Sequence, residues 1–175
     1  MSAGFVVWLT GLPGSGKSTI AIHLKPELQN MGFPVEILDG DEIRTNLSKG
    51  LGFSREDRET HLKRVTYVAK LLSRNRVAVI GALISPYRSI REYARKETTN
   101  FLEVYVKCSV ETCAKRDPKG LYKKAKTGEI KDLTGPQDLY EEPLAPDLVI
   151  DTENLTLEQS VDQIMRKLRE DGLLN

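Results

Sequence analysis

The segment that most constrains the fold of this chain is residues 11–18, which read GLPGSGKS and fit the pattern G-x-x-x-x-G-K-[ST]. An apolar, strand-like run at residues 5–9 comes directly before it, and a stretch of helical period follows. Glycines at this spacing let backbone N–H groups turn inward, and the start of the helix adds its positive dipole end. The segment therefore predicts a loop that binds phosphate through Gly11, Leu12, Pro13, Gly14, Ser15, Gly16, Lys17, Ser18 and Thr19.

Two side chains of this phosphate loop carry further expectations. Lys17 should reach the β and γ phosphates of a nucleotide as a mobile positive charge, which makes it a candidate catalytic residue. The Ser18 hydroxyl should be a ligand of a Mg²⁺ ion that bridges the same phosphates. The loop thus predicts Mg²⁺ as a cofactor and a nucleoside triphosphate as a co-substrate.

The rest of the chain alternates β-branched apolar runs with stretches of helical period, which is typical of an α/β fold with a parallel sheet. We predict strands at residues 5–9, 35–39, 77–83, 101–107 and 148–151. Five such strands give a three-layer α/β/α P-loop NTPase fold, in one domain over residues 1–175. Ser54 with Asp57, and Thr156 with Gln159, are N-cap patterns that predict a helix after each cap.

Residues 117–146, which we call the lid segment, differ from the rest of the chain. They hold Pro118, Pro136, Pro143 and Pro146, together with three glycines and five lysines. A long segment of this kind in a compact domain is usually a functional lid or a solvated surface loop. We expect a mobile lid without an apolar core of its own, which closes over bound substrates.

The composition narrows the class of partner and the compartment. Lys plus Arg number 26 and Asp plus Glu number 25, and a net charge of +1 argues against nucleic-acid binding. The apolar runs are well short of the ~20 residues that span a bilayer, and the N-terminus lacks the pattern of a signal peptide. Cys108 and Cys113 do not have the spacing of a zinc site or disulfide framework and should be ordinary buried or half-buried thiols. We expect a cytoplasmic protein without a membrane or nucleic-acid partner.

The sequence favours a small-molecule kinase over a GTPase or a motor. The guanine-binding pattern N-K-x-D is absent, and no acid follows the predicted strand at residues 77–83. The acids at a strand end near the phosphate loop are Asp39 and Asp41. Asp41 is the best candidate to accept a proton from the attacking hydroxyl, because the carboxyl ends of parallel strands meet at the site. Its alternative role is the N-cap of a helix that begins at Glu42.

Four further segments make the chain resemble the adenylylsulfate kinases (APS kinases). They are LDGDEIR at residues 38–44, GFSREDR at 52–58, ISPYR at 84–88 and RDPKGLYK at 116–123, and the likeness runs from about residue 5 to 151. The resemblance implies an adenylate-kinase-like fold and transfer of the γ-phosphoryl group of ATP to the 3′-hydroxyl of adenosine 5′-phosphosulfate (APS), which gives PAPS and ADP in sulfate assimilation. It also implies ATP and APS as partners and a possible homodimer.

The resemblance assigns roles to individual residues of the acceptor site. Asp41 matches a catalytic aspartate, and Arg44 and Arg58 match arginines whose planar forks hold the phosphosulfate; surface ion pairs are their alternative. Phe53 matches an aromatic that lies against the acceptor's adenine, or is a simple loop anchor. Ser85, together with Ile84, matches the acceptor site.

In the family this serine has been considered as a phosphorylated intermediate. We expect direct transfer instead, because the sequence places no histidine or lysine beside Ser85 to serve as its base. The resemblance also places Arg116 near the ATP base and Lys123 and Lys131 toward the phosphates, with free lysines in a solvated loop as the alternative.

Three positions depart from the family pattern. The family usually has Asn at the positions of Glu42 and His61, and Phe at that of Leu133. His61 still offers a donor and an acceptor to a ribose or base edge, whereas Leu133 would cost the acceptor's adenine a stacking contact of roughly 1 to 3 kcal/mol. A kinase of another hydroxylated anionic metabolite is therefore an alternative, as is a non-enzymatic ATP-binding regulatory domain, although the phosphate loop and candidate acid are intact.

Overall fold

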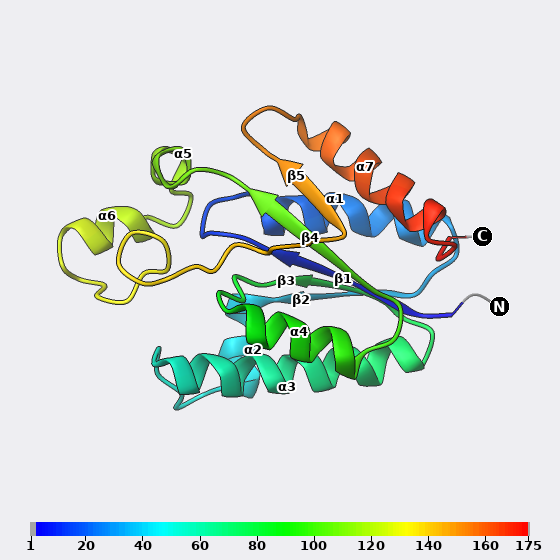
Figure 1. Cartoon of the computed structure of the whole chain (residues 1–175), viewed down its shortest axis with the longest axis horizontal. Helices are drawn as coiled ribbons and strands as arrows, with labels where there is room; N and C mark the ends of the chain where they lie inside the picture. The colour runs from blue at the N-terminus through cyan, green and yellow to red at the C-terminus, as the bar shows by residue number, and fades with distance from the viewer. Residues whose placement is uncertain (1–2, 175) are drawn as a thin grey trace.

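The computed structural model describes residues 3–174 and contains a parallel sheet of five strands in the order β2-β3-β1-β4-β5 (Figure 1). The ends of the predicted domain, residues 1, 2 and 175, lie outside the described part. The strands are β1 (Phe5–Thr10), β2 (Val35–Asp39), β3 (Ala78–Ala82), β4 (Phe101–Lys107) and β5 (Leu148–Asp151). The predicted strands are confirmed: β1 extends one residue further, and β3 is one residue shorter at each end.

Helices pack on both faces of the sheet, with α1 and α7 on one side and α3 and α4 on the other (Figure 1). Both predicted caps are confirmed, since Ser54 accepts a hydrogen bond from the Asp57 N–H and Thr156 forms a capping box with Gln159. The helices are α1 (Lys17–Asn30), α2 (Gly40–Leu47), α3 (Arg55–Arg74), α4 (Arg88–Glu97), α5 (Val110–Arg116), α6 (Leu121–Lys126) and α7 (Leu157–Glu170).

The central strand β1 is buried along its whole length because helices cover both faces of the parallel sheet. Its side chains alternate between two apolar cores. Val7 and Leu9 belong to the core beneath α1 and α7, whereas Val6 and Trp8 belong to the core beneath α3 and α4. The sheet therefore holds the turn that follows β1 on a rigid support.

The lid segment has apolar packing of its own, so the expectation of a loop without a core is wrong. It contains α6, and its Tyr122, Ala125 and Leu133 are buried with Leu12 and Cys113 in a third apolar cluster. Apolar residues scattered among the prolines and lysines suffice for this because the phosphate loop and α5 supply the other half of the cluster. Cys108 lies in the same cluster, and both cysteines are buried free thiols, as predicted.

No helix between residues 3 and 174 combines the length and the apolar character required to cross a membrane.

Candidate active site

A cavity of about 560 Å³ opens where β1, β2 and β3 end and the loops after them begin. Such a position, outside the carboxyl ends of parallel strands, is where α/β folds bind ligands. Its lining comes from the phosphate loop, the start of α2, the start of α3, residues 84–86, and the beginning of the lid segment with Thr152. The topology thus brings together most of the segments singled out in the sequence.

Glycine is required at several positions of the phosphate loop. Gly14 and Gly16 have φ values of 79° and 105°, in the left-handed region that disfavours other residues. A β-carbon on Gly11 would lie 2.4 Å from the carbonyl oxygen of Val106. The loop can therefore keep its turn only with this glycine pattern, and Gly16 leads directly into the N-terminus of α1.

Lys17 is buried at the base of the loop. Its Nζ donates to the carbonyl oxygens of Gly11 at 2.9 Å and Leu12 at 2.7 Å. Burial lowers the pKa of the Lys17 ammonium to about 8. The group therefore still carries its charge at neutral pH, and its partners are neutral carbonyls that a phosphate can outcompete.

Ser18 and Asp39 place a hydroxyl and a carboxylate side by side. The Ser18 Oγ donates to Asp39 Oδ2 at 2.8 Å, and Asp39 Oδ1 accepts from the Asp41 N–H at 3.1 Å. Asp39 is therefore the N-cap of α2, and the alternative that Asp41 caps a helix beginning at Glu42 is wrong. The difference arises because α2 begins two residues earlier than that alternative assumed.

Asp41 lies in the first turn of α2 with its side chain 74% exposed to solvent at the cavity wall. Its carboxylate is free of the capping role and forms an ion pair with Lys119 of the lid segment. Lys119 also lines the cavity, and its charge is one of the influences that lower the Lys17 pKa. A carboxylate and two cations therefore face the same space.

An aromatic ring and cationic groups form another part of the cavity lining. Phe53 is 56% exposed, and the Arg44 guanidinium lies 4.4 Å from the centre of its ring. Arg44 also donates to the Gly52 carbonyl. Burial lowers the pKa of His61 to about 4, helped by the charges of Arg44 and Arg64, so its imidazole is neutral at physiological pH.

Ser85 adopts a φ of 43°, which is unfavourable for a serine. Its Oγ accepts a hydrogen bond from the Trp8 indole at 3.0 Å and donates to the Leu83 carbonyl at 3.3 Å. Neither partner is a base. The hydroxyl is therefore held as a structural group rather than activated as a nucleophile.

The family model for adenylylsulphate kinase matches residues 3–151. The chain belongs to the adenylylsulphate kinase family. A probable adenylyl-sulfate kinase of Pseudomonas aeruginosa is 54% identical over 164 residues, covering 94% of this chain and 77% of the relative. The adenylyl-sulfate kinase of Rippkaea orientalis is 52% identical over 171 residues, covering 98% and 94% of the two chains. ATP-dependent phosphorylation of APS to PAPS is the reaction of this family, as the resemblance implied.

Solved structures agree with this assignment. The Mycobacterium tuberculosis APS kinase, solved in complex with AMPPNP and APS, superposes with a TM-score of 0.91 at 36% identity over 97% of this chain and 99% of that one. The shikimate kinase of Aquifex aeolicus, 17% identical with a TM-score of 0.54 over 98% and 100% of the two chains, shares the fold. The predicted α/β P-loop kinase architecture is confirmed.

The kinase brings most of the predicted site residues to the cavity. These are Pro13, Gly14, Ser15, Gly16, Lys17, Ser18, Thr19, Asp41, Arg44, Phe53, Arg58, His61, Ile84, Ser85 and Arg116. Arg116 is fixed at its edge, where it donates to Thr152 Oγ1 at 3.0 Å and to the Thr152 carbonyl at 2.7 Å. Thr152 in turn donates to the Ser15 carbonyl, which links Arg116 to the phosphate loop.

Five predicted residues do not line the cavity. The Gly11 and Leu12 carbonyls instead accept hydrogen bonds from Lys17, and Leu133 is buried with Leu12 in the third cluster rather than at the cavity. Lys123 and Lys131 also lie outside the lining residues. Packing of Leu133 in that cluster removes its apolar surface from water, which is more favourable in free energy than leaving the side chain exposed in the cavity.

Arg58 lies at the cavity but is occupied elsewhere. Its Nε donates to the Phe53 carbonyl at 2.7 Å, Nη1 to Thr134 Oγ1 at 2.8 Å and Nη2 to the Asp132 carbonyl at 2.7 Å. An ion pair with Asp138 at 3.2 Å completes its contacts. None of these partners is one of the acids at residues 56, 57 and 59, and together they join α3 to the lid segment.

Sequence reasoning left Asp39, Lys119 and Thr152 out of the predicted site. Asp39 had a detectable signal, since it stands at the end of β2 beside Asp41. Lys119 also had one, because it belongs to the segment at residues 116–123 that carries the resemblance. Thr152 had none, because its place beside Ser15 depends on how β5 docks on β4.

Proposed function

We propose that this kinase holds ATP on its phosphate loop and the acceptor APS against Asp41, Arg44 and Phe53, and transfers the γ-phosphoryl group directly between them. The observation that carries the proposal is that one cavity is lined by both groups of residues. Phosphoryl transfer needs the nucleophile aligned with the γ-phosphorus, cations around the migrating group and an acceptor for the hydroxyl proton. Lys17 and Lys119 supply the cations and Asp41 supplies the proton acceptor.

Lys17 exchanges its carbonyl partners for phosphate oxygens when ATP binds. Its positive charge then stabilises the negative charge on the γ-phosphoryl group during transfer. Asp41 accepts the proton of the 3′-hydroxyl, for which its exposed carboxylate in the cavity wall is suited. When the acceptor enters, Lys119 can turn from Asp41 toward the phosphates, since its side chain lines the cavity and is half-exposed. Ser85 takes no covalent part because no base lies beside it.

The chemistry of Ser18 and Asp39 fits a Mg²⁺ ion. A hydroxyl and a carboxylate oxygen 2.8 Å apart are hard ligands, and Mg²⁺ in kinases is held by one or two such groups together with substrate phosphates. Residues 3–174 contain no cluster of three or more His, Cys, Asp or Glu side chains that could hold a metal, so substrate phosphates and water would complete the coordination of the ion. The ion would supply positive charge to the β and γ phosphates.

On the acceptor side, Phe53 offers a ring face to the adenine and Arg44 a planar fork to the phosphosulfate. Arg58 orients Phe53 through the Phe53 carbonyl and fixes residues 132–134 of the lid segment, which is a supporting role. His61 is neutral and shares a hydrogen bond with Ser48 at 2.7 Å, which leaves its other ring nitrogen for the acceptor.

The test is an ATP-consumption assay across candidate acceptors, with APS first and gluconate and shikimate as comparisons, in the presence and absence of Mg²⁺. We expect rapid turnover only with APS and Mg²⁺. Arg44→Met, which keeps an unbranched stem but removes the charge and the planar fork, should raise KM for APS and leave that for ATP unchanged. Preference for another acceptor would refute the assignment of this wall.

We further propose that residues 117–146 work as the lid of a single kinase domain, that the protein is cytoplasmic and that it forms a homodimer. Two buried free thiols suit a reducing compartment. Light scattering on the purified chain tests the dimer through its molar mass, and a mass near 19.7 kDa would refute it.

A further inference from the structure

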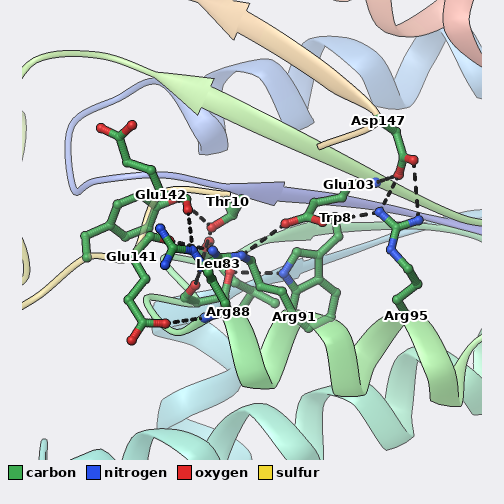
Figure 2. A network of polar contacts seen from close by, with 12 residues as sticks. Trp8, Thr10, Leu83, Arg88, Arg91, Arg95, Glu103, Glu141, Glu142 and Asp147 are labelled. Atoms are coloured by element: carbon green, nitrogen blue, oxygen red, sulfur yellow. Dashed lines mark hydrogen bonds and ion pairs between the residues drawn. The ribbon is translucent and has the colours of Figure 1, made fainter. Parts of the chain in front are cut away.

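Arg91 of α4 carries a charged group that lies almost wholly inside the protein, with 2% of the residue exposed. Its guanidinium donates in three directions: Nε to Glu103 of β4 at 3.0 Å, Nη1 to the Ser85 carbonyl at 2.6 Å, and Nη2 to the Glu141 carbonyl (Figure 2). The charge is matched by the carboxylate of Glu103. Three segments that are far apart in the sequence therefore meet at one side chain.

The first of these segments, residues 84–86, forms part of the cavity wall. It includes the unfavourable backbone conformation at Ser85, which persists only where surrounding contacts determine it. Thr10 of β1 donates to the Ile84 carbonyl at 2.7 Å, and Arg91 holds the next carbonyl along. The shape of this wall thus depends on donors from β1 and α4.

The second segment is the stem of the lid segment, residues 140–142, where the chain returns toward β5. The Glu141 N–H donates to the Pro86 carbonyl at 2.8 Å, which attaches the stem to the same wall. The Tyr140 hydroxyl shares a hydrogen bond of 2.9 Å with Thr10. Besides Arg91, the stem therefore has one direct link to the wall and a second through Thr10, which itself donates to the Ile84 carbonyl.

We propose that Arg91 is a positioning residue for the acceptor, which holds the wall at residues 84–86 and the stem of the lid segment in one fixed relation. The proposal rests on the proposed function, in which this wall borders the acceptor. Arginine suits the role because its planar fork donates along several fixed directions, whereas a lysine ammonium has one flexible point of charge. Movement of the lid segment then leaves its stem aligned with the wall.

Arg95, one helical turn further along α4, provides a matched control. It donates to Glu103 at 3.2 Å and to Asp147 at 2.7 Å, and is therefore part of the same ionic cluster (Figure 2). Its hydrogen bonds go to these two carboxylates and not to the wall or the stem. If both arginines only support the fold, substitution of either should change the kinetics alike. If Arg91 positions the acceptor, only its substitution should change KM for APS.

The experiment compares Arg91→Lys with Arg95→Lys in the full chain, each with a thermal melt and with steady-state kinetics in which one substrate is varied and the other is saturating. Both variants keep a cation beside Glu103, so the buried carboxylate is not left unpaired. We expect Arg91→Lys to raise KM for APS about tenfold while KM for ATP and the values for Arg95→Lys stay within about twofold of wild type. Equal KM values for APS in the two variants would overturn the proposal.

Tyr140→Phe decides the matter if Arg91→Lys does not fold. It removes only the hydroxyl that links the stem to Thr10. A selective rise in KM for APS supports the coupling of stem and wall, and an unchanged KM overturns it. If wild type itself does not phosphorylate APS, the proposed function fails and this inference with it; if wild type does so and the variants match it, the inference alone fails.

Discussion

Acidification is expected to destabilise this kinase through His61. The folded pKa is about 4 because the imidazole is buried, against an ordinary value of 6.5. Between these two values the unfolded chain binds a proton that the folded chain does not, so the stability contributed by neutral His61 is lost as pH falls below 6.5. Linkage gives a loss of about 1.4 kcal/mol on going from about pH 7.5 to about pH 5.5.

The assay is urea unfolding of wild type and His61→Asn at both pH values. Asparagine keeps a polar group near Ser48 but does not titrate. The variant therefore lacks the contribution of His61 to the pH dependence of the free energy of unfolding, whereas the contributions of all other titratable groups are common to both proteins. We expect the free energy of unfolding of wild type to fall by about 1.4 kcal/mol more than that of the variant. Parallel losses in the two proteins would refute the argument that burial holds this histidine neutral.

Lys17→Ala should abolish activity and leave the melting temperature close to that of wild type, because its partners are two loop carbonyls; a rate above about a tenth of wild type would refute its role. Asp41→Ala should lose roughly two to four orders of magnitude in rate, whereas Ser85→Ala should keep most activity; the reverse result at saturating ATP would favour a phosphoenzyme. Leu133→Phe, which from sequence alone would tighten APS binding, should instead cost about 1 to 3 kcal/mol of stability in urea unfolding, because the larger ring must fit the cluster around Leu12. Hydrogen exchange of the lid segment should slow when ATP and APS are both bound, and equal exchange in both states would contradict lid closure.

Local patterns were enough to predict the strands, the phosphate loop and the caps at Ser54 and Thr156. Each depends on residues a few positions apart, such as the hydrogen bond from the Asp57 N–H to Ser54. The same reasoning missed contacts between distant segments. The family resemblance placed Leu133 at the acceptor, and nothing in its sequence neighbourhood reveals that it is buried with Leu12 and Cys113.

Arg58 and Arg91 illustrate the same limit for charged side chains. An arginine near acids in the sequence suggests a surface ion pair, yet Arg58 reaches Thr134 and Arg91 reaches Glu141. Which carbonyls lie within reach is decided by how the lid segment returns across the sheet. A helical spacing can place an arginine on a buried face, but it cannot identify the partners that compensate its charge.

The place of β1 at the centre of the sheet has a consequence for biosynthesis. The first strand to leave the ribosome pairs with β3 on one side and β4 on the other, both made much later. During elongation at about 5 to 20 residues per second, its largely apolar surface remains for seconds without a partner strand. Folding is therefore governed by long-range pairing and should be slow, and a nascent chain that ends before Phe101 lacks one neighbour of its most buried strand.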